Sequence, residues 1–167
     1  METAYIALGA NIPSSAGSPA QTLADALIRL GELGKVRAQS SFHQTLPVGY
    51  ADQPVFLNAA AALETDLEPG PLLDRLLEIE RAFGRDRSHC IPNGPRTLDL
   101  DLLIYGDRIL DTPSLVLPHP RMASRIFVLA PLQEIAPGLI HPLFKRSVSQ
   151  LLHDLSQMKE VSPDGGM

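Results

Sequence analysis

The chain has 167 residues, 44% hydrophobic and 20% charged, which is typical of one globular domain of α and β elements with a sizeable core. A net charge of −5 and a pI of about 5.4 disfavour general binding to nucleic acid or anionic membranes, so an anionic ligand needs a local basic cluster. The single cysteine, Cys90, excludes an intrachain disulfide, and no apolar run has the length of a signal peptide or a membrane span. We therefore expect one cytoplasmic, monomeric domain over residues 1–167.

The N-terminal segment predicts a strand followed by a helix. Residues 3–8 are apolar enough for a buried strand, and the triplet from Gly9 to Asn11 suits a tight turn at its exit. Ser18, Pro19 and Gln21 supply a capping residue, a proline at the first helical position and a reciprocal partner for the cap. A helix is therefore expected to begin at this point.

The next elements are two strands and a second helix. Alternation predicts strands over 36–45 and 55–65, and an apolar stripe predicts a helix over 69–83. In the strand over 55–65 one face is apolar core, whereas Phe56 and Asn58 share the other face with small alanines. That second face is suited to the floor of a pocket.

The order strand, helix, strand, strand, helix, strand predicts an α+β fold, the ferredoxin-like sandwich with an antiparallel sheet. Both helices cover one sheet face in that architecture, which leaves the other face free for function. The C-terminal additions are predicted to be a short hairpin partner over 108–110, short helical turns including one over 127–133, and a last helix over 145–155. A frayed tail is expected from about residue 156.

Polar and apolar residues alternate from Arg96 to Asp101, the period of a strand with one accessible face. Asp99 and Asp101 share a face, and their carboxylates can converge to about 4 Å, where two like charges repel by about 4 kcal/mol at an effective dielectric near 20. Two carboxylates without a nearby His or Cys favour Mg²⁺, which completes its shell with water and phosphate oxygens and so points to ATP. Alternatively, both aspartates are solvated and paired with neighbouring arginines.

Basic residues are concentrated near this strand. Seven of the fourteen Lys and Arg residues lie between positions 81 and 125, and no Gly-rich P-loop is present, so side chains must hold any phosphates. Arg85 and Arg87 on a predicted mobile loop, and Arg96 at the start of the strand, are either surface ion-pair residues or phosphate clamps. His119 is pre-positioned between two prolines, although a lone loop histidine is usually inert.

Four groups of residues form a combination of high specificity. They are Phe56-Leu-Asn58-Ala, Gly84-Arg85, Gly94-Pro-Arg-Thr-Leu-Asp-Leu-Asp101, and Pro118-His119 followed by Arg125 and Phe127. This combination resembles the hydroxymethyldihydropterin pyrophosphokinase family of folate-pathway enzymes over most of the chain, from about Ala4 to Pro142. The resemblance implies a ferredoxin-like core, two Mg²⁺ ions, and transfer of the β,γ-pyrophosphoryl group of ATP to the hydroxymethyl group of a reduced pterin, with release of AMP.

The resemblance also implies a role for each matching residue. Asp99 and Asp101 would hold both Mg²⁺ ions, and these aspartates form the catalytic set with Arg85 and Arg96. The nucleotide contacts would be Arg85, Arg96, His119 and Arg125, and the loop position adds Arg87 as a further phosphate clamp. Glu80, on the flank of the apolar stripe of its helix, resembles a carboxylate behind the site and needs a partner there.

The pterin contacts follow in the same way. Asn58 would bond the pterin edge, and Phe56 and Phe127 would sandwich the ring. Thr45, Leu46 and Val48 would add backbone or wall contacts. Asn93 stands where many relatives carry an aromatic residue, so the resemblance says least about the loop before the aspartate strand.

The expected mechanism depends mainly on positioning. Metal ions would neutralise the negative charge of the phosphate oxygens, and the pterin hydroxyl would be aligned with the β-phosphorus. No residue stands out as a general base. Two other classes remain open. A ferredoxin-like nucleotide- or pterin-binding domain without turnover predicts binding that is indifferent to Mg²⁺. An RNA-binding module of similar topology needs a basic sheet face with exposed aromatics, which the aspartate pair disfavours.

Overall fold

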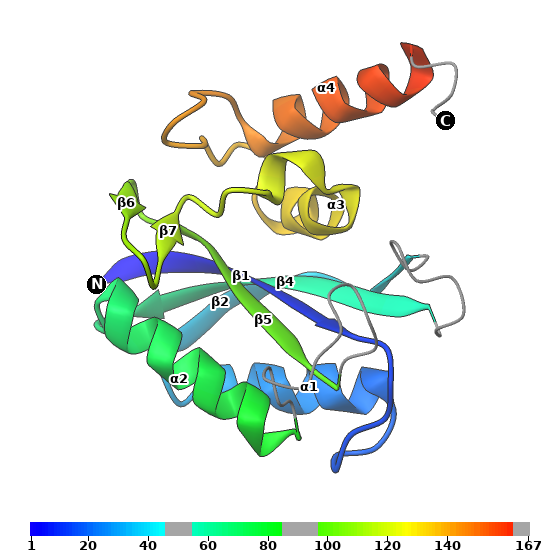
Figure 1. Ribbon diagram of the computed structural model, residues 1–167, viewed down its shortest axis with the longest axis vertical. Helices are drawn as coiled ribbons and strands as arrows, with labels where there is room; N and C mark the ends of the chain where they lie inside the picture. The colour runs from blue at the N-terminus through cyan, green and yellow to red at the C-terminus, as the bar shows by residue number, and fades with distance from the viewer. Residues whose placement is uncertain (46–54, 85–96, 162–167) are drawn as a thin grey trace.

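The computed structural model describes residues 1–45, 55–84 and 97–161, and places one antiparallel sheet between two helical layers (Figure 1). In chain order the elements up to the aspartate strand are β1 (Glu2–Ala10), α1 (Pro19–Leu30), β2 (Lys35–Gln39), β3 (His43–Thr45), β4 (Phe56–Thr65), α2 (Pro69–Ala82) and β5 (Asp99–Tyr105). They are followed by β6 (Leu110–Asp111), β7 (Val116–Leu117), a 3₁₀ turn (Met122–Ser124), α3 (Ile126–Ile135) and α4 (Val148–Val161).

The sheet follows the strand order β2-β4-β1-β5, with β3 also paired to β4, and every pairing is antiparallel. Helices α1 and α2 cover one face (Figure 1). The core on that side contains Leu8, Leu63 and Leu100 from the strands and Leu23 and Leu76 from the helices. The predicted combination of an antiparallel sheet with two helices on one face is therefore confirmed.

The start of α1 follows its predicted local signal. Ser18 Oγ accepts a hydrogen bond from the Gln21 backbone N–H at 3.3 Å, and Gln21 Oε1 accepts one from the Ser18 backbone N–H at 2.9 Å. Pro19 occupies the first helical position. Two N–H groups that the helix cannot satisfy itself are thus paired reciprocally.

The second face of the sheet is covered in part, which corrects the prediction that it is free. Helix α3 packs on it, with α4 stacked outside α3 (Figure 1). A second core joins Ala7 and Ala60 of the sheet to Val128, Leu129 and Leu132 of α3. The alanines of β4 lack bulk, so α3 lies close to the strand. The sequence predicts only a short turn near this helix, which has ten residues in the structure.

The predicted strand over 36–45 is divided into β2 and β3 by Ser40, which is 4% exposed. Its backbone N–H donates to Ala60 O at 2.9 Å, and its Oγ accepts from the Ala60 N–H at 2.9 Å. The same hydroxyl donates to Ser41 O at 2.7 Å. The side chain therefore replaces one ladder bond and lets the backbone turn between the two short strands.

Strand β5 contains a bulge. Ile6 is opposite Leu102 and Tyr5 is opposite Ile104, so Leu103 is an extra residue. Leu102 and Tyr105 belong to the core under α1 and α2, whereas both Leu103 and Ile104 belong to the core under α3. Both faces of this part of β5 are therefore covered, which explains why the sequence after Asp101 is apolar without alternation.

The other differences concern element ends. Strand β1 continues through Gly9 and Ala10, where the sequence suggests a turn. The predicted hairpin partner after Gly106 pairs as β6 with β7 rather than with β5. Helix α4 begins at Val148 and continues to Val161, beyond the residue from which we expect a frayed tail. Among the described helices, none combines the length and the apolar character needed to span a membrane.

Replacing Ser18 by alanine removes the hydrogen bond from the Gln21 N–H to Ser18 Oγ, whereas the bond from the residue 18 N–H to Gln21 Oε1 remains. We expect Ser18→Ala to lower the free energy of unfolding by about 1 kcal/mol. Urea denaturation followed by circular dichroism measures this change. Ser15→Ala, at an exposed serine in the same loop, is the control, and an equal loss in both variants would contradict the assignment of the cap.

Candidate active site

Four polar or glycine positions form one row across the second face of the sheet. His43 on β3 is opposite Asn58 on β4, Asn58 is opposite Gly9 on β1, and Gly9 is opposite Asp99 on β5. Directly opposed residues in antiparallel strands point to the same face. Because neighbouring strands are about 4.8 Å apart, the backbones of Asn58 and Asp99 are separated by about 10 Å.

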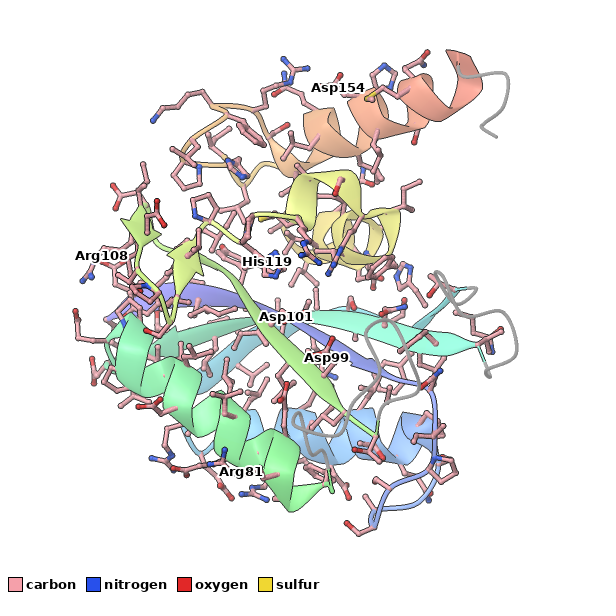
Figure 2. The ribbon with its side chains drawn as sticks, in the orientation of Figure 1. Arg81, Asp99, Asp101, Arg108, His119 and Asp154 are labelled. Atoms are coloured by element: carbon pink, nitrogen blue, oxygen red, sulfur yellow. The ribbon has the colours of Figure 1, made fainter. Side chains whose placement is uncertain are left out.

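The two aspartates lie on this face, as predicted. Asp99 and Asp101 project from β5 (Figure 2) and are partly buried. Leu100 between them is 1% exposed and belongs to the core under α1 and α2. Among the described residues, no cluster of three or more His, Cys, Asp and Glu side chains is placed to hold a metal ion. Asp99 and Asp101 offer carboxylate oxygens from one strand face, a donor set that fits an ion such as Mg²⁺, which takes its other ligands from water and phosphate.

The partner predicted for Glu80 is the backbone of β5. Glu80 is 1% exposed, and its Oε2 accepts a hydrogen bond from the Leu100 N–H at 2.7 Å. Leu100 stands between Asp99 and Asp101. A carboxylate from α2 thus holds the backbone of the strand at the point where both aspartates project from it.

His119 is fixed next to the same strand (Figure 2). Its backbone N–H donates to Leu103 O at 2.8 Å, and its Nδ1 accepts from the Arg121 N–H at 3.1 Å. Burial, followed by the positive charge of Arg125, lowers the pKa of His119 from 6.5 to about 4, and the negative charge of Asp99 opposes this shift. The ring is therefore neutral at pH 7. Because Nδ1 is an acceptor, Nε2 carries the proton and is a donor.

Three of the predicted pterin contacts, Thr45, Phe56 and Asn58, lie together on β3 and β4, and Phe127 packs against the core on the same side of the sheet. Asn58 is 7% exposed, and its Nδ2 donates to Thr45 Oγ1 at 2.7 Å. Thr45 is opposite Phe56 in the ladder between β3 and β4. At the start of α3, the Arg125 guanidinium lies over the Phe127 ring, 5.5 Å from its centroid.

Several predicted residues lie outside the part of the chain that the structure describes. They are Leu46, Val48, Arg85, Arg87 and Arg96. Conversely, Gly9 and Arg121 belong to the site in the structure but were not singled out from the sequence. A glycine inside an apolar strand marks a close approach of another group, and that signal identifies Gly9. Nothing in the spacing of Arg121 indicates that its backbone N–H orients the histidine.

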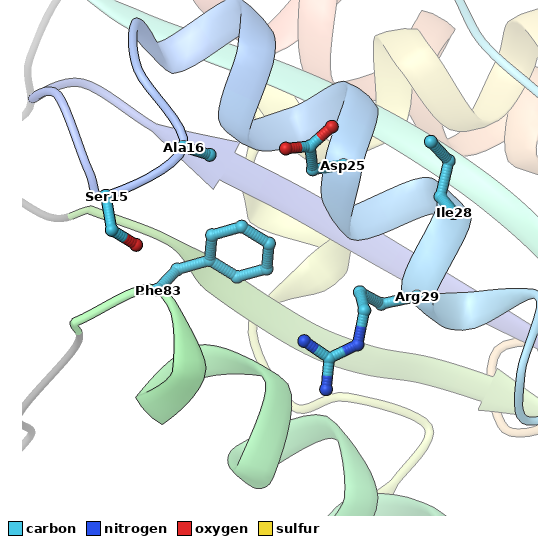
Figure 3. A pocket seen from close by; sticks show the side chains of 6 residues that line it. All are labelled: Ser15, Ala16, Asp25, Ile28, Arg29 and Phe83. Atoms are coloured by element: carbon cyan, nitrogen blue, oxygen red, sulfur yellow. The ribbon is translucent and has the colours of Figure 1, made fainter.

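A cavity of about 360 Å³ opens on the opposite side of the sheet, between α1 and the end of α2 (Figure 3). Its lining includes Asp25, Ile28 and Arg29 from α1 and Phe83 after α2. Arg29 pairs with Glu32 at 3.3 Å. Among its described lining residues Asp25 is the single carboxylate, so this lining does not match the predicted pair.

A family model described as 7,8-dihydro-6-hydroxymethylpterin-pyrophosphokinase (HPPK) matches residues 5–137. The chain belongs to this family. Among relatives named 2-amino-4-hydroxy-6-hydroxymethyldihydropteridine pyrophosphokinase, the protein of Pseudomonas aeruginosa is 45% identical over 142 residues, covering 85% of each chain. The protein of Bacillus subtilis is 45% identical over 132 residues, covering 79% of this chain and 77% of the relative.

In longer relatives the region similar to this chain is only a part of the protein. The folic acid synthesis protein fol1 of Pneumocystis carinii is 38% identical over 165 residues, which cover 97% of this chain and 22% of that protein. The crystal structure of Plasmodium falciparum HPPK-DHPS with SDX-DHP has a TM-score of 0.70 at 15% identity, over 96% of this chain and 45% of that one. This chain spans less than half of that structure, and the likeness shows a shared fold.

The environment of His119 predicts a pH dependence. Its pKa is about 4 in the folded protein against an ordinary value of 6.5, so the unfolded chain binds the proton first as the pH falls. The stability that the neutral ring contributes is complete above pH 6.5 and is lost as the pH falls through about 4. NMR titration of the ring in the presence of a chelator measures the pKa, and a midpoint near 6.5 would contradict the described environment.

Proposed function

We propose that this chain transfers the β,γ-pyrophosphoryl group of ATP to the hydroxymethyl group of 6-hydroxymethyl-7,8-dihydropterin and releases AMP, as a step of folate biosynthesis. The observation that carries the proposal is the row from Asn58 through Gly9 to Asp99. It places an amide suited to a heterocycle edge about 10 Å from a carboxylate suited to metal-bound phosphates, with a residue that has no side chain between them.

We assign the core to the ferredoxin-like class because its strand order is β2-β4-β1-β5 with antiparallel pairing throughout. We further propose that the chain works as a monomer in the cytoplasm, in keeping with its expected small-molecule substrates, ATP and a reduced pterin.

Asp99 and Asp101 would hold two Mg²⁺ ions, and the position of both partly buried aspartates on one strand face supports this assignment. Bound Mg²⁺ supplies charge neutralisation at the phosphate oxygens. Glu80 keeps both aspartates in position through the backbone of Leu100. The Nε2 proton of neutral His119 would bind a phosphate oxygen without loss of the proton.

Arginines would bind the remaining charge of the triphosphate. The positive charge of Arg125 acts on His119, which supports a shared role for the guanidinium and the imidazole at one phosphate group. The assignment of Arg85, Arg87 and Arg96 to the triphosphate, with Arg85 and Arg96 in the catalytic set, rests on the family resemblance. Guanidinium groups fit phosphate oxygens in pairs, which favours this assignment.

Side chains from two layers would hold the pterin. Asn58, oriented by Thr45, would bond the polar edge of the ring. Phe56 on β4 and Phe127 on α3 would stack on its two faces, and Leu46 and Val48 would complete the wall. The aromatic groups come from the sheet and from the helix above it, so the spacing between these layers determines the width of the pterin slot.

The reaction follows from this placement. The pterin hydroxymethyl oxygen forms a bond to the β-phosphorus of ATP, while the bond from this phosphorus to the α,β-bridging oxygen breaks. AMP leaves with that oxygen, and the hydroxyl proton passes to solvent. Exact placement of the reacting atoms supplies most of the rate because the protein performs no covalent step itself.

The nucleotide product tests the proposal directly. The chain is incubated with ATP, Mg²⁺ and the reduced hydroxymethylpterin, and we expect equal amounts of AMP and pterin diphosphate. ADP as the sole nucleotide product would overturn pyrophosphoryl transfer. Pterin binding that is independent of Mg²⁺, without any turnover, would favour a non-catalytic binding domain.

Removal of either aspartate tests the metal assignment. We expect Asp99→Ala and Asp101→Ala to lower the rate of AMP formation by at least about 100-fold, because the phosphates lose their charge stabilisation. Asp111→Ala, at an exposed aspartate on β6, is the matched control and should retain the parent rate. Folded variants of Asp99 and Asp101 that form AMP at the parent rate would show that the assignment is wrong.

Gly9 tests the role of the row. A Cβ at Gly9 would stand 3.2 Å from Asn58 Oδ1, so Gly9→Ala displaces the amide. We expect the KM for the pterin to rise by about tenfold with a smaller change in the KM for ATP. Steady-state kinetics measure both constants. Gly70→Ala serves as the control because its Cβ would meet no atom within 4 Å.

A further inference from the structure

The carboxylate of Glu134 on α3 receives three hydrogen bonds from one corner of the sheet. Ser41 donates its backbone N–H to Oε2 at 2.9 Å and its hydroxyl to Oε1 at 2.8 Å. His43 Nε2 lies 3.0 Å from the same Oε1. These contacts, with the His43 bond as the largest cause, lower the pKa of Glu134 to about 2. The carboxylate is therefore charged at every physiological pH.

These contacts join the two layers that would enclose the pterin. Glu134 lies seven positions after Phe127, which is about two helical turns, so both side chains lie on the same face of α3. His43 and Thr45 are two apart on β3 and share one face of the strand. The expected aromatic plate, Phe127, and the Glu134 contacts thus lie about two turns apart on the same face of α3.

The corner that Glu134 holds also forms the end of the active-site row. His43 is directly opposite Asn58 in the ladder, and Asn58 in turn donates to Thr45 on the same short strand. Strand β3 has only three residues, so it forms only three residue pairs with β4 in the ladder. Contacts from α3 therefore contribute strongly to its placement.

We propose that Glu134 is a positioning residue for the pterin site, which sets the distance between α3 and β3 and thereby the width of the slot between Phe127 and Phe56. The inference rests on the proposed function and deepens it. An exposed ion pair alone usually contributes little. Here a backbone N–H, a hydroxyl and an imidazole converge on one carboxylate, and they fix a specific alignment of helix and strand.

The test compares the kinetic constants of Glu134→Ala with those of the parent chain. We expect the KM for the pterin to rise about tenfold, while the KM for ATP and kcat stay within about twofold, because only the pterin slot is altered. The dissociation constant of the pterin, followed by its fluorescence in the presence of a non-hydrolysable ATP analogue, should rise by the same factor. Unchanged pterin constants in the folded variant would overturn the proposal.

Graded and matched variants separate positioning from general stability. Glu134→Gln keeps one acceptor oxygen and the side-chain volume, and Ser41→Ala removes one of the three bonds, so both should raise the pterin KM less than Glu134→Ala. Asp154→Ala is the control. Asp154 lies on α4, beyond α3 (Figure 2), and accepts a hydrogen bond from Arg146 Nε at 2.8 Å. This variant should leave the pterin KM unchanged.

The outcomes distinguish this inference from the proposed function. A parent chain that forms no AMP would contradict the proposed function itself. An active parent, with Glu134→Ala raising both KM values equally, would contradict the positioning role alone. If Glu134→Ala does not fold, the comparison rests on Glu134→Gln and Ser41→Ala, and pterin constants equal to those of the parent in both variants would overturn the inference.

Discussion

The buried carboxylate of Glu80 is the interaction on which the geometry of the site depends. Among the described strands, β5 lies at the end of the sheet path, so no described strand neighbours the N–H groups on its outer side. A carboxylate that is 1% exposed is costly unless it accepts hydrogen bonds, and the Leu100 N–H supplies one. Two groups that are unfavourable when separate thus satisfy each other, and the result is a fixed strand segment with an aspartate on either side of Leu100.

The features that the sequence predicted well are local. The cap of α1 depends on residues within four positions of each other, and the alternation that places Asp99 and Asp101 on one face requires only the period of a strand. The partner of Glu80 was expected in kind, since an acidic group near an apolar stripe needs a donor. That this donor is the backbone of the aspartate strand became evident only from the packing of α2 against β5.

The features that the sequence did not reveal depend on contacts between distant segments. Ser40 divides a predicted strand because its side chain bonds to Ala60, twenty residues away. The second face of the sheet was expected to be free, but helix α3 covers part of it because the small alanines on β4 leave room for the helix. An alanine in a strand does not indicate whether its side chain faces a helix or solvent, so the sequence could not predict this packing. The partners of Glu134 are more than ninety positions away, so no local pattern indicates its role.

The bulge in β5 has a consequence for how the length of this strand can vary. The extra residue, Leu103, divides β5 into two regular segments. The first contains the two aspartates and the second contains Tyr105, and side chains alternate between the two faces within each segment. Deletion of Leu103 would leave a regular strand in which all the remaining side chains keep their present faces. Deletion of Leu100 would instead turn Asp99 toward the core under α1 and α2. A family member can therefore lose a residue at the bulge and keep its carboxylates in place, whereas the segment between the aspartates has a fixed length.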